Sequence, residues 1–222
     1  MPTSTVEDYL KCILAQQERD PEALVTMGQI GSALGVAPGT VTAMVKTLAE
    51  SGLLFYEPYS GVRLSEAGEG LATHVLRRHR LIELFLVEMM GLDWSDVHEE
   101  AELLEHAVSE RLIDRIDEML GRPSVDPHGD PIPNRALEIP SSDATSLLAC
   151  PERQLQLVVR VGDQSAEFLR LLEHRGLVPG SQIIVDSRSE AADNVELSNA
   201  EGAQVSLGFR AASKVFVRPA SP

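Results

Sequence analysis

The chain has 222 residues, of which 43% are hydrophobic and 24% charged, and its formal net charge is −15. This composition is typical of a globular protein with two or three domains, and no apolar run is long enough to span a bilayer. The polar N-terminus lacks the features of a signal peptide, and Cys12 and Cys150 are too few for a disulfide framework or a thiolate zinc site, so we expect a cytoplasmic protein. The strong negative charge also argues against non-specific binding to nucleic acid.

Two helices are predicted at the start of the chain. Residues 4–7 have the form of a capping box, and apolar residues follow at helical spacing, which predicts a helix over about residues 6–18. Residues 26–29 form a second capping box, which opens a short helix that Gly35 can end. A helix, a short helix and a tight turn are the first part of a helix-turn-helix.

A third helix and a hairpin complete this unit. Pro38 can occupy the first turn of the third helix, which Gly52 ends, and residues 53–57 and 62–64 predict two strands around a turn. This order of elements predicts a winged helix-turn-helix, although other small α/β domains share it. Residues 35–42 favour DNA binding because they supply both a tight turn and an exposed helix start with small polar side chains.

Candidate DNA contacts lie at the start of the third helix and in the wing. They are Ala37, Pro38, Gly39, Thr40, Thr42, Ala43, Lys46, Ser60 and Arg63. The hydroxyl groups and the cations among them are candidates for phosphate contacts. Ala43 is too small to read a base by hydrogen bonding, so we expect specificity to depend on thymine-methyl contacts and on DNA shape.

The middle of the chain is predicted to be helical from Leu71 to about Leu120, with a break near residues 91–96. Residues 81–90 are apolar around much of the helix circumference, which is typical of a helix buried on more than one side and predicts a homodimer interface. Residues 121–153 contain six prolines and predict an extended linker.

The C-terminal part predicts a small β domain. A β-rich run is expected at residues 155–161, a short helix at 165–173, and further strands near 182–185, 194–197, 204–207 and 214–217. Several short strands with one helix indicate an SH3-like β-barrel. The predicted fold is mainly α with small β: a winged helix-turn-helix over residues 1–72, a helical dimerisation and metal-binding domain over 73–140, and the SH3-like domain over 150–222.

Histidines and carboxylates cluster in the middle domain. Four of them fall within about a 100° arc of one helix: His98, Glu102, Glu105 and His106. The preceding helix carries an i, i+4 pair: His79 and Glu83. Clustered carboxylates repel one another unless a cation neutralises them, so we favour a metal site here over a solvated acidic face. For Glu99 and Glu100 we prefer the solvated face, and we interpret His128 and His174 as surface or structural residues.

The ligand types indicate the metal. Nitrogen and oxygen ligands without sulfur suit Mn(II) or Fe(II) and disfavour Cu(I) and structural zinc, although affinity alone would rank Zn(II) and Ni(II) higher. Paired carboxylates also occur in metalloenzymes and glycosidases. No nucleophile motif or phosphate loop accompanies them in this sequence, so we expect no enzymatic activity and no small-molecule substrate.

Four segments of the chain carry a family resemblance: residues 6–10 (VEDYL), 38–42 (PGTVT), 78–83 (RHRLIE) and 97–106 (VHEEAELLEH). They resemble the diphtheria-toxin-repressor family of metal-dependent transcription regulators, which includes the manganese-transport regulators. Residues 129–133 (GDPIP) match the segment closing the family's dimerisation domain, and residues 168–180 are similar to its SH3-like, iron-transport-accessory-type domain. The resemblance implies a repressor that binds palindromic double-stranded operator DNA as a homodimer when loaded with metal.

The resemblance also implies two metal sites per subunit. The first would use Asp8, Glu102, Glu105 and His106. The second would use His79, Glu83 and His98, completed from the C-terminal domain by Gln164 and Glu167, whose order is reversed relative to iron-type members. Iron-sensing members have Met and Cys where this chain has Asp8 and Glu102, whereas manganese-sensing members have carboxylates, so we expect Mn(II), with an Fe(II)-dependent regulator as the alternative. Short manganese regulators have a carboxylate where this chain has Lys11.

The implied first site would join two domains, since Asp8 belongs to the DNA-binding domain and the other ligands to the dimerisation domain. A bound metal would fix the angle between these domains and favour the form whose recognition helices match successive major grooves. Residues 1–76 carry four Lys/Arg against nine Asp/Glu, so the metal-free protein should bind DNA poorly. Each divalent ion would offset two of these negative charges.

Overall fold

The computed structural model describes residues 2–141, 143–199 and 202–220. They form two compact units, which are described separately. Unit 1 comprises Met1–His79, Leu104–Val108 and Pro133–Glu138; unit 2 comprises Arg80–Leu103, Ser109–Ile132 and Ile139–Pro222. Within the described ranges, no helix combines the length and the apolar character that crossing a membrane requires.

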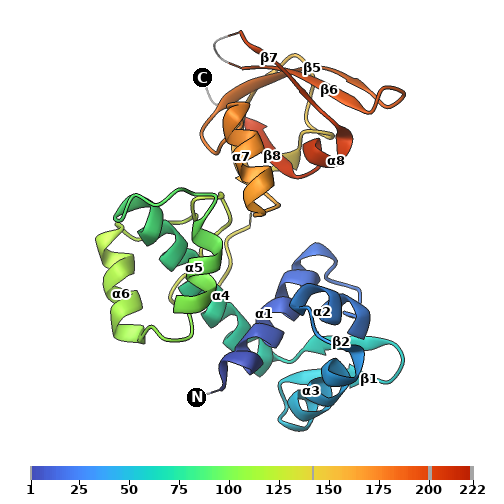
Figure 1. Ribbon diagram of the computed structural model, residues 1–222, viewed down its shortest axis with the longest axis vertical. Coiled ribbons are helices and arrows are strands. Elements are labelled where there is room, and N and C mark those ends of the chain that lie inside the picture. Colours follow the sequence, from blue (N-terminus) through green and yellow to red (C-terminus); the bar gives the residue numbers. More distant parts are fainter. Residues whose placement is uncertain (1, 142, 200–201, 221–222) are drawn as a thin grey trace. The chain divides into compact units, whose positions relative to one another are not determined.

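The helix-turn-helix in unit 1 consists of α1 (Ser4–Arg19), α2 (Met27–Leu34) and α3 (Pro38–Glu50) (Figure 1). The predicted capping box between Thr26 and Gln29 opens α2. The helix ends at Gly35, whose φ of 65° is the left-handed conformation that glycine adopts readily. Pro38 begins α3, as predicted. Local sequence chemistry therefore accounts for the boundaries of α2 and for the start of α3.

The capping box predicted at the start of α1 is wrong. Thr3 is the N-cap, and its side chain accepts a hydrogen bond from the Val6 amide. Glu7 was expected to reach back to the helix start, but its carboxylate accepts from Arg78 and pairs with His106 instead. A buried arginine and a histidine are worth more to this carboxylate than one exposed backbone amide.

The wing is an antiparallel hairpin of β1 (Leu54–Glu57) and β2 (Gly61–Leu64). At its tip Tyr59 has a φ of 67°, and its side chain is fully exposed. The core of the helix-turn-helix and wing consists of apolar residues from all five elements: Leu10, Ile13, Ile30, Val41, Val45, Leu48, Leu54 and Val62. Because α3 turns its apolar face to this core, its other face remains exposed.

Three further helices follow: α4 (Glu66–Glu88), α5 (Val97–Leu104) and α6 (Glu110–Met119). The first begins at Glu66 rather than at the predicted Leu71, because the Ser65 hydroxyl accepts from the Gly68 amide and caps an earlier turn. The helical pattern also stops between α5 and α6, which was not predicted. Residues 105–109 lie in that break, so Glu105 and His106 are not on a helix.

The C-terminal part of unit 2 is a six-stranded antiparallel sheet in the order β3-β8-β4-β5-β6-β7. Its strands are β3 (Thr145–Ser146), β4 (Leu155–Val161), β5 (Gln182–Ser189), β6 (Asn194–Asn199), β7 (Gln204–Leu207) and β8 (Val215–Pro219), and its helices are α7 (Ala166–His174) and α8 (Phe209–Ala212). One buried apolar cluster joins the sheet to Leu169 and Leu172 of α7. The SH3-like prediction is confirmed, although β3 and α8 were not predicted.

The predicted linker contains a structured turn. Val125 and Pro131 pair as an isolated bridge and enclose residues 126–130. Gly129 within this turn has a φ of 85°, and a Cβ there would lie 1.8 Å from the carbonyl oxygen of Val159 on β4. Only glycine allows the turn to approach the strand so closely. This part of the chain is therefore packed on β4 and is not a free spacer.

Candidate metal centre

In unit 1, Asp8 of α1 faces the two residues that follow α5. Asp8 Oδ1 lies 2.8 Å from His106 Nε2, and Glu105 Oε1 lies 3.5 Å from the same nitrogen. These three side chains each offer a ligand atom within 4.8 Å of the other two. The structure thus brings together three of the four residues predicted for the first site.

Glu7 holds His106 from the opposite side of the imidazole ring. Its Oε2 lies 2.6 Å from His106 Nδ1, and its Oε1 accepts from Arg78 Nη2 at 3.0 Å. A carboxylate on one imidazole nitrogen fixes the tautomer and leaves the other nitrogen available to a metal. The sequence interpretation missed Glu7. Its spacing of three residues before Leu10 places it on the buried face of α1, where a charged residue is unusual and could have drawn attention.

Glu105 is fully buried and has two basic partners. Lys11 Nζ lies 2.6 Å from Oε1, and His79 Nδ1 lies 2.6 Å from Oε2. Lys11 therefore places a positive charge on an oxygen predicted to bind metal. His79, which was predicted for the second site, lies on a residue of the first.

In unit 2, Glu83 of α4 and His98 of α5 form the centre of the predicted second site. Glu83 Oε1 lies 3.1 Å from His98 Nδ1, and His98 Nε2 lies 3.7 Å from Glu102 Oε1. Glu102, predicted for the first site, thus pairs here with a histidine predicted for the second. His79 precedes Glu83 by one turn of α4.

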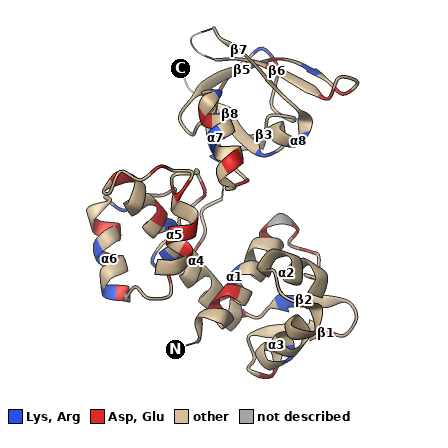
Figure 2. Ribbon diagram, in the orientation of Figure 1, with Lys and Arg blue, Asp and Glu red and all other residues tan. Residues whose placement is uncertain are grey.

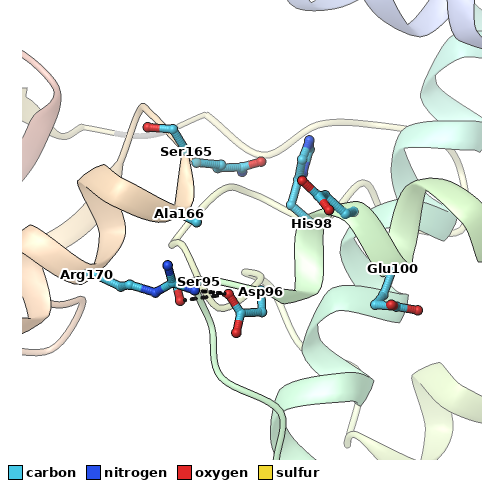
Figure 3. Close-up of a pocket in the computed structure, with 9 residues that line it drawn as sticks. Ser95, Asp96, His98, Glu100, Ser165, Ala166 and Arg170 are labelled. Carbon is cyan, nitrogen blue, oxygen red and sulfur yellow. Dashed lines mark hydrogen bonds and ion pairs between the residues drawn. The ribbon is translucent and has the colours of Figure 1, made fainter.

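A cavity of about 690 Å³ opens beside His98 (Figure 3). Gln164 lines it, as do Asp96 and Arg170, which form an ion pair of 2.6 Å that Figure 3 marks with dashed lines. Gln164 therefore faces the same cavity as His98. Glu167, its predicted companion, is exposed and is not among the described residues that line the cavity.

Both clusters fit a divalent metal ion. Every donor atom is a nitrogen or an oxygen, which suits Mn(II) and Fe(II). His106 and His98 each present Nδ1 to one carboxylate and Nε2 to another. For His106, whose Nδ1 partner Glu7 lies outside the predicted ligands, this is the arrangement of histidine ligands in metalloproteins, in which the outer carboxylate orients the ring and raises the basicity of the other nitrogen.

The residues predicted to contact DNA lie on one part of unit 1. Those with exposed side chains are Ala37, Pro38, Gly39, Thr40, Ala43, Lys46, Ser60 and Arg63. Thr42 is half-buried and donates its hydroxyl to the carbonyl of Pro38 at 2.9 Å. The Arg63 guanidinium lies 5.1 Å from the centre of the Phe55 ring, which supports it on the wing. Lys46 and Glu50 are the charged residues of α3, so this helix is close to neutral in an acidic protein (Figure 2).

Three family models match the chain. They are "Iron dependent repressor, N-terminal DNA binding domain" over residues 1–62, "Iron dependent repressor, metal binding and dimerisation domain" over residues 65–134, and "FeoA domain" over residues 145–219. The iron-dependent repressor IdeR of Mycobacterium tuberculosis is 31% identical over 196 residues, which are 82% of this chain and 84% of IdeR. The chain belongs to the iron-dependent repressor family.

Manganese regulators are also among its relatives in this family. The transcriptional regulator MntR of Lysinibacillus sphaericus is 38% identical over 120 residues, or 54% of this chain and 84% of MntR. A solved manganese-dependent transcriptional repressor in complex with manganese has a TM-score of 0.88 and 38% identity, and covers 97% of this chain and 100% of its own. The manganese regulator SloR has a TM-score of 0.79 and 30% identity, and covers 99% of this chain and 100% of its own. These comparisons confirm the predicted family and its metal-dependent, DNA-binding class.

Proposed function

We propose that this chain is a metal-activated repressor that binds palindromic operator DNA as a homodimer, with Mn(II) as its activating ion. The observation that carries the proposal is the contact of Asp8, on the first helix of the DNA-binding domain, with His106 and Glu105. A carboxylate, an imidazole held by Glu7 and a second carboxylate suit a divalent ion in an otherwise acidic protein.

Two sets of residues would hold metal. Asp8, Glu102, Glu105 and His106 form the first, and His79, Glu83, His98 and Gln164, with Glu167 as a further candidate, form the second. A bound ion supplies the positive charge that allows clustered carboxylates to stay together and joins residues distant in sequence. The residues themselves orient the imidazoles and exclude water, since Glu105 and Glu83 have no exposed surface.

The covalent path from the first set explains how metal would affect the arrangement of the chain. Residues 104–108 cluster with α1 in unit 1, but the helices before and after them, α5 and α6, belong mainly to unit 2. A metal ion that holds Glu105 and His106 next to Asp8 would therefore restrain residues 104–108, which connect α5 to α6. Such a restraint selects some arrangements of the units from a broader ensemble.

The recognition surface would be the exposed face of α3 with the wing. Thr40 and Lys46 of α3 and Arg63 of the wing are exposed, and they can contact phosphates. Tyr59, which the sequence interpretation did not select, is fully exposed at the wing tip and is an additional candidate. Because α3 has little net charge, the affinity would depend more on shape and on two recognition helices acting together than on charge alone.

The homodimer would form through the apolar end of α4. Met89 and Met90 are 51% and 60% exposed, and Met119 at the end of α6 is 46% exposed. Together with Leu84 and Pro123, Met89 and Met119 line a shallow groove. Exposed apolar side chains grouped in this way are typical of a subunit interface.

DNA binding measured across a series of metals tests the proposal. An operator is first selected from a random duplex library with the Mn(II)-loaded protein, and its binding is then followed by fluorescence anisotropy with Mn(II), Fe(II), Zn(II), Ni(II) or chelator. We expect binding with Mn(II) at the lowest metal concentration, and none with chelator. An Fe(II) optimum would favour the iron-sensing alternative, and equal binding by metal-free protein would contradict metal activation.

Asp8→Ala, compared with Glu22→Ala on an exposed loop of the same unit, tests the coupling. The first variant should still bind Mn(II) through the remaining ligands but should bind the operator poorly even at saturating Mn(II). The control should behave like the wild type. Full recovery of operator binding by Asp8→Ala at saturating Mn(II) would mean that the Asp8 contact does not transmit the signal.

A further inference from the structure

A third cluster of ligand atoms lies in unit 2, outside the two proposed sites except for the shared residue Glu83. Glu83, Asp126 and His128 each offer an atom within 4.8 Å of the other two. Their side chains are almost completely enclosed, with 0%, 3% and 0% of their surface exposed. From the sequence His128 was interpreted as a surface or a structural residue. Its complete burial excludes the surface interpretation. Two carboxylates enclosed in this way require compensating positive charge.

His128 is oriented as a metal ligand is. Its Nε2 lies 2.8 Å from the carbonyl oxygen of Trp94 and must carry the proton, because a carbonyl can only accept. In the neutral imidazole the lone pair is then on Nδ1. That atom is buried and makes no hydrogen bond within the described part of the chain, and the same is true of Asp126 Oδ2. A buried imidazole nitrogen that has no hydrogen-bond partner and faces two carboxylates is best satisfied by a cation bound between them.

Two other histidines of this protein show the distance of a direct hydrogen bond between an imidazole and a carboxylate. His106 Nδ1 and His79 Nδ1 lie 2.6 Å from Glu7 and Glu105 respectively. His128 Nδ1 lies 3.7 Å from Glu83 Oε2, although both side chains are fully buried. An imidazolium would be expected to close this distance to about 2.7–2.9 Å. The 3.7 Å between His128 Nδ1 and Glu83 Oε2 fits two ligand atoms of one metal ion better than a direct hydrogen bond.

Arg80 supplies positive charge on the Asp126 side of this cluster. Arg80 Nε lies 3.8 Å from Asp126 Oδ2, and the same guanidinium donates through Nη1 to the Pro131 carbonyl at 2.5 Å. This arginine can balance the charge of Asp126.

We propose that Glu83 Oε2, Asp126 Oδ2 and His128 Nδ1 bind a third divalent cation, with Mn(II) as the best match to two carboxylates and one imidazole. Metal–ligand bonds of about 2.0–2.2 Å separate ligand atoms by about 3–4.4 Å, so atoms within 4.8 Å of one another need to shift by only a few tenths of an ångström to enclose an ion. The other oxygen of Glu83 faces His98 at 3.1 Å. Glu83 would therefore bridge this site and the proposed second site, and to that extent the inference rests on the proposed function.

The site would tie α4 to the C-terminal sheet. Asp126 and His128 lie in the turn packed on β4, and the carbonyl of His128 accepts from the Val161 amide at 2.8 Å. Asp130 of the same turn accepts from Gln164 at 3.0 Å and pairs with Arg160 at 3.3 Å. An ion held by Glu83 on one side and by this turn on the other would restrain the first strand that follows the linker.

Counting bound Mn(II) in matched variants tests the inference. Asp126→Asn removes one ligand oxygen but keeps Oδ1, which accepts the amides of His128 and Asp130 at 2.8 and 2.9 Å, so the turn should survive. Asp130→Asn makes the same change of charge in the same turn outside the ligand set. With the full-length chain dialysed against Mn(II), we expect three ions per chain in the wild type and in Asp130→Asn, and two in Asp126→Asn. A crystal of the wild type grown with Mn(II) should show an anomalous peak between His128 and Asp126, and this measurement needs no variant.

The outcomes separate the two proposals. Two ions in the wild type with metal-dependent DNA binding, or three in Asp126→Asn, would overturn the third site and leave the proposed function standing. No bound Mn(II) in the wild type would overturn both. An equal loss of bound Mn(II) in Asp126→Asn and Asp130→Asn would show that Mn(II) binding depends only on the negative charge of the turn. This result too would overturn the ligand assignment. Exchange of the Val161 amide with solvent should slow on adding Mn(II) in the wild type but not in Asp126→Asn, and an unchanged rate in the wild type would contradict the restraint on β4.

Discussion

Glu7→Gln is the sharpest perturbation of the first proposed site, because it leaves every predicted ligand in place. The Glu7 carboxylate has two oxygens and two partners, His106 Nδ1 at 2.6 Å and Arg78 Nη2 at 3.0 Å. An amide has one oxygen and one NH2 group, so it can satisfy only one of these donors. If the amide oxygen stays with Arg78, its NH2 group faces His106 and favours the tautomer with the proton on Nε2. That proton would point at Asp8, where the metal is proposed to bind.

The size of the effect follows from this geometry. Loss of an outer carboxylate partner of a histidine ligand weakens metal binding by about 10–100-fold, which corresponds to about 1.4–2.7 kcal/mol. We expect Mn(II) affinity, measured by calorimetric titration of the full chain, to fall within this range. Glu22→Gln makes the same chemical change on an exposed loop of unit 1 and should leave the affinity unchanged.

DNA binding by Glu7→Gln distinguishes a weakened site from a damaged fold. Since Asp8, Glu105 and His106 remain, operator binding should return to the wild-type level once Mn(II) is raised by the same factor. An Mn(II) affinity within twofold of the wild type would refute the role given to Glu7 and the proposed position of the ion. Operator binding that never recovers would show that Glu7 acts on the fold and not on the metal.

Three other perturbations have defined outcomes. Lys11→Met removes the ammonium group that contacts Glu105, so the melting temperature measured with chelator should fall. The affinity for Mn(II) should rise by about tenfold, because a charged hydrogen bond of about 1.5–3 kcal/mol no longer competes with the metal for the Glu105 carboxylate. A lower Mn(II) affinity would contradict competition between Lys11 and the metal. Burial acts to raise the pKa of Asp163, but Lys214 and Ser165 lower it to about 2 from 3.8, so the pair stabilises the fold above about pH 4 and this stabilisation is lost as the pH falls toward 2. Asp163→Asn should therefore reduce the free energy of unfolding by about 1–2 kcal/mol at pH 7, after allowance for solvent screening, and by much less near pH 2, as denaturant titrations at both pH values would show. Met89→Glu should weaken dimerisation at least about tenfold in sedimentation, whereas Leu155→Glu, an equally drastic change at an exposed residue of β4, should not.

Local chemistry made the N-terminal fold predictable. The Thr26–Gln29 capping box, Gly35 and Pro38 each act within a few residues, and all three occur where the sequence places them. The exception is the start of α1, where Glu7 is drawn to His106, 99 residues away. No local rule includes such a partner.

The candidate sites were predictable in part as groups, since Asp8, Glu105 and His106 lie together as predicted, and so do Glu83 and His98. Helical spacing placed Glu102 on one helix with Glu105 and His106, but α5 ends at Leu104, so Glu105 and His106 lie beyond the helix, and Glu102 pairs with His98. The third cluster was invisible for a similar reason. His128 lies among prolines and glycine, and its partner Glu83 is 45 positions earlier on a different element. Only the packing of the turn against β4 and α4 brings them together.

The basic residues around these clusters bear on what kind of switch the protein is. Glu7 has Arg78 and Glu105 has Lys11 in the first cluster, and Asp126 has Arg80 in the third, so these two clusters keep part of their charge balanced without metal. A buried carboxylate with no cation would cost several kcal/mol and would make folding depend on metal, as in small zinc domains.

This partial balance favours a chain that folds without metal and changes only its distribution of arrangements when metal binds. The remaining negative charge sets how strongly metal acts, because each ion neutralises what the arginines and the lysine leave uncompensated. Under the proposed function, partial compensation by permanent cations would allow metal concentration to regulate DNA binding without regulating folding.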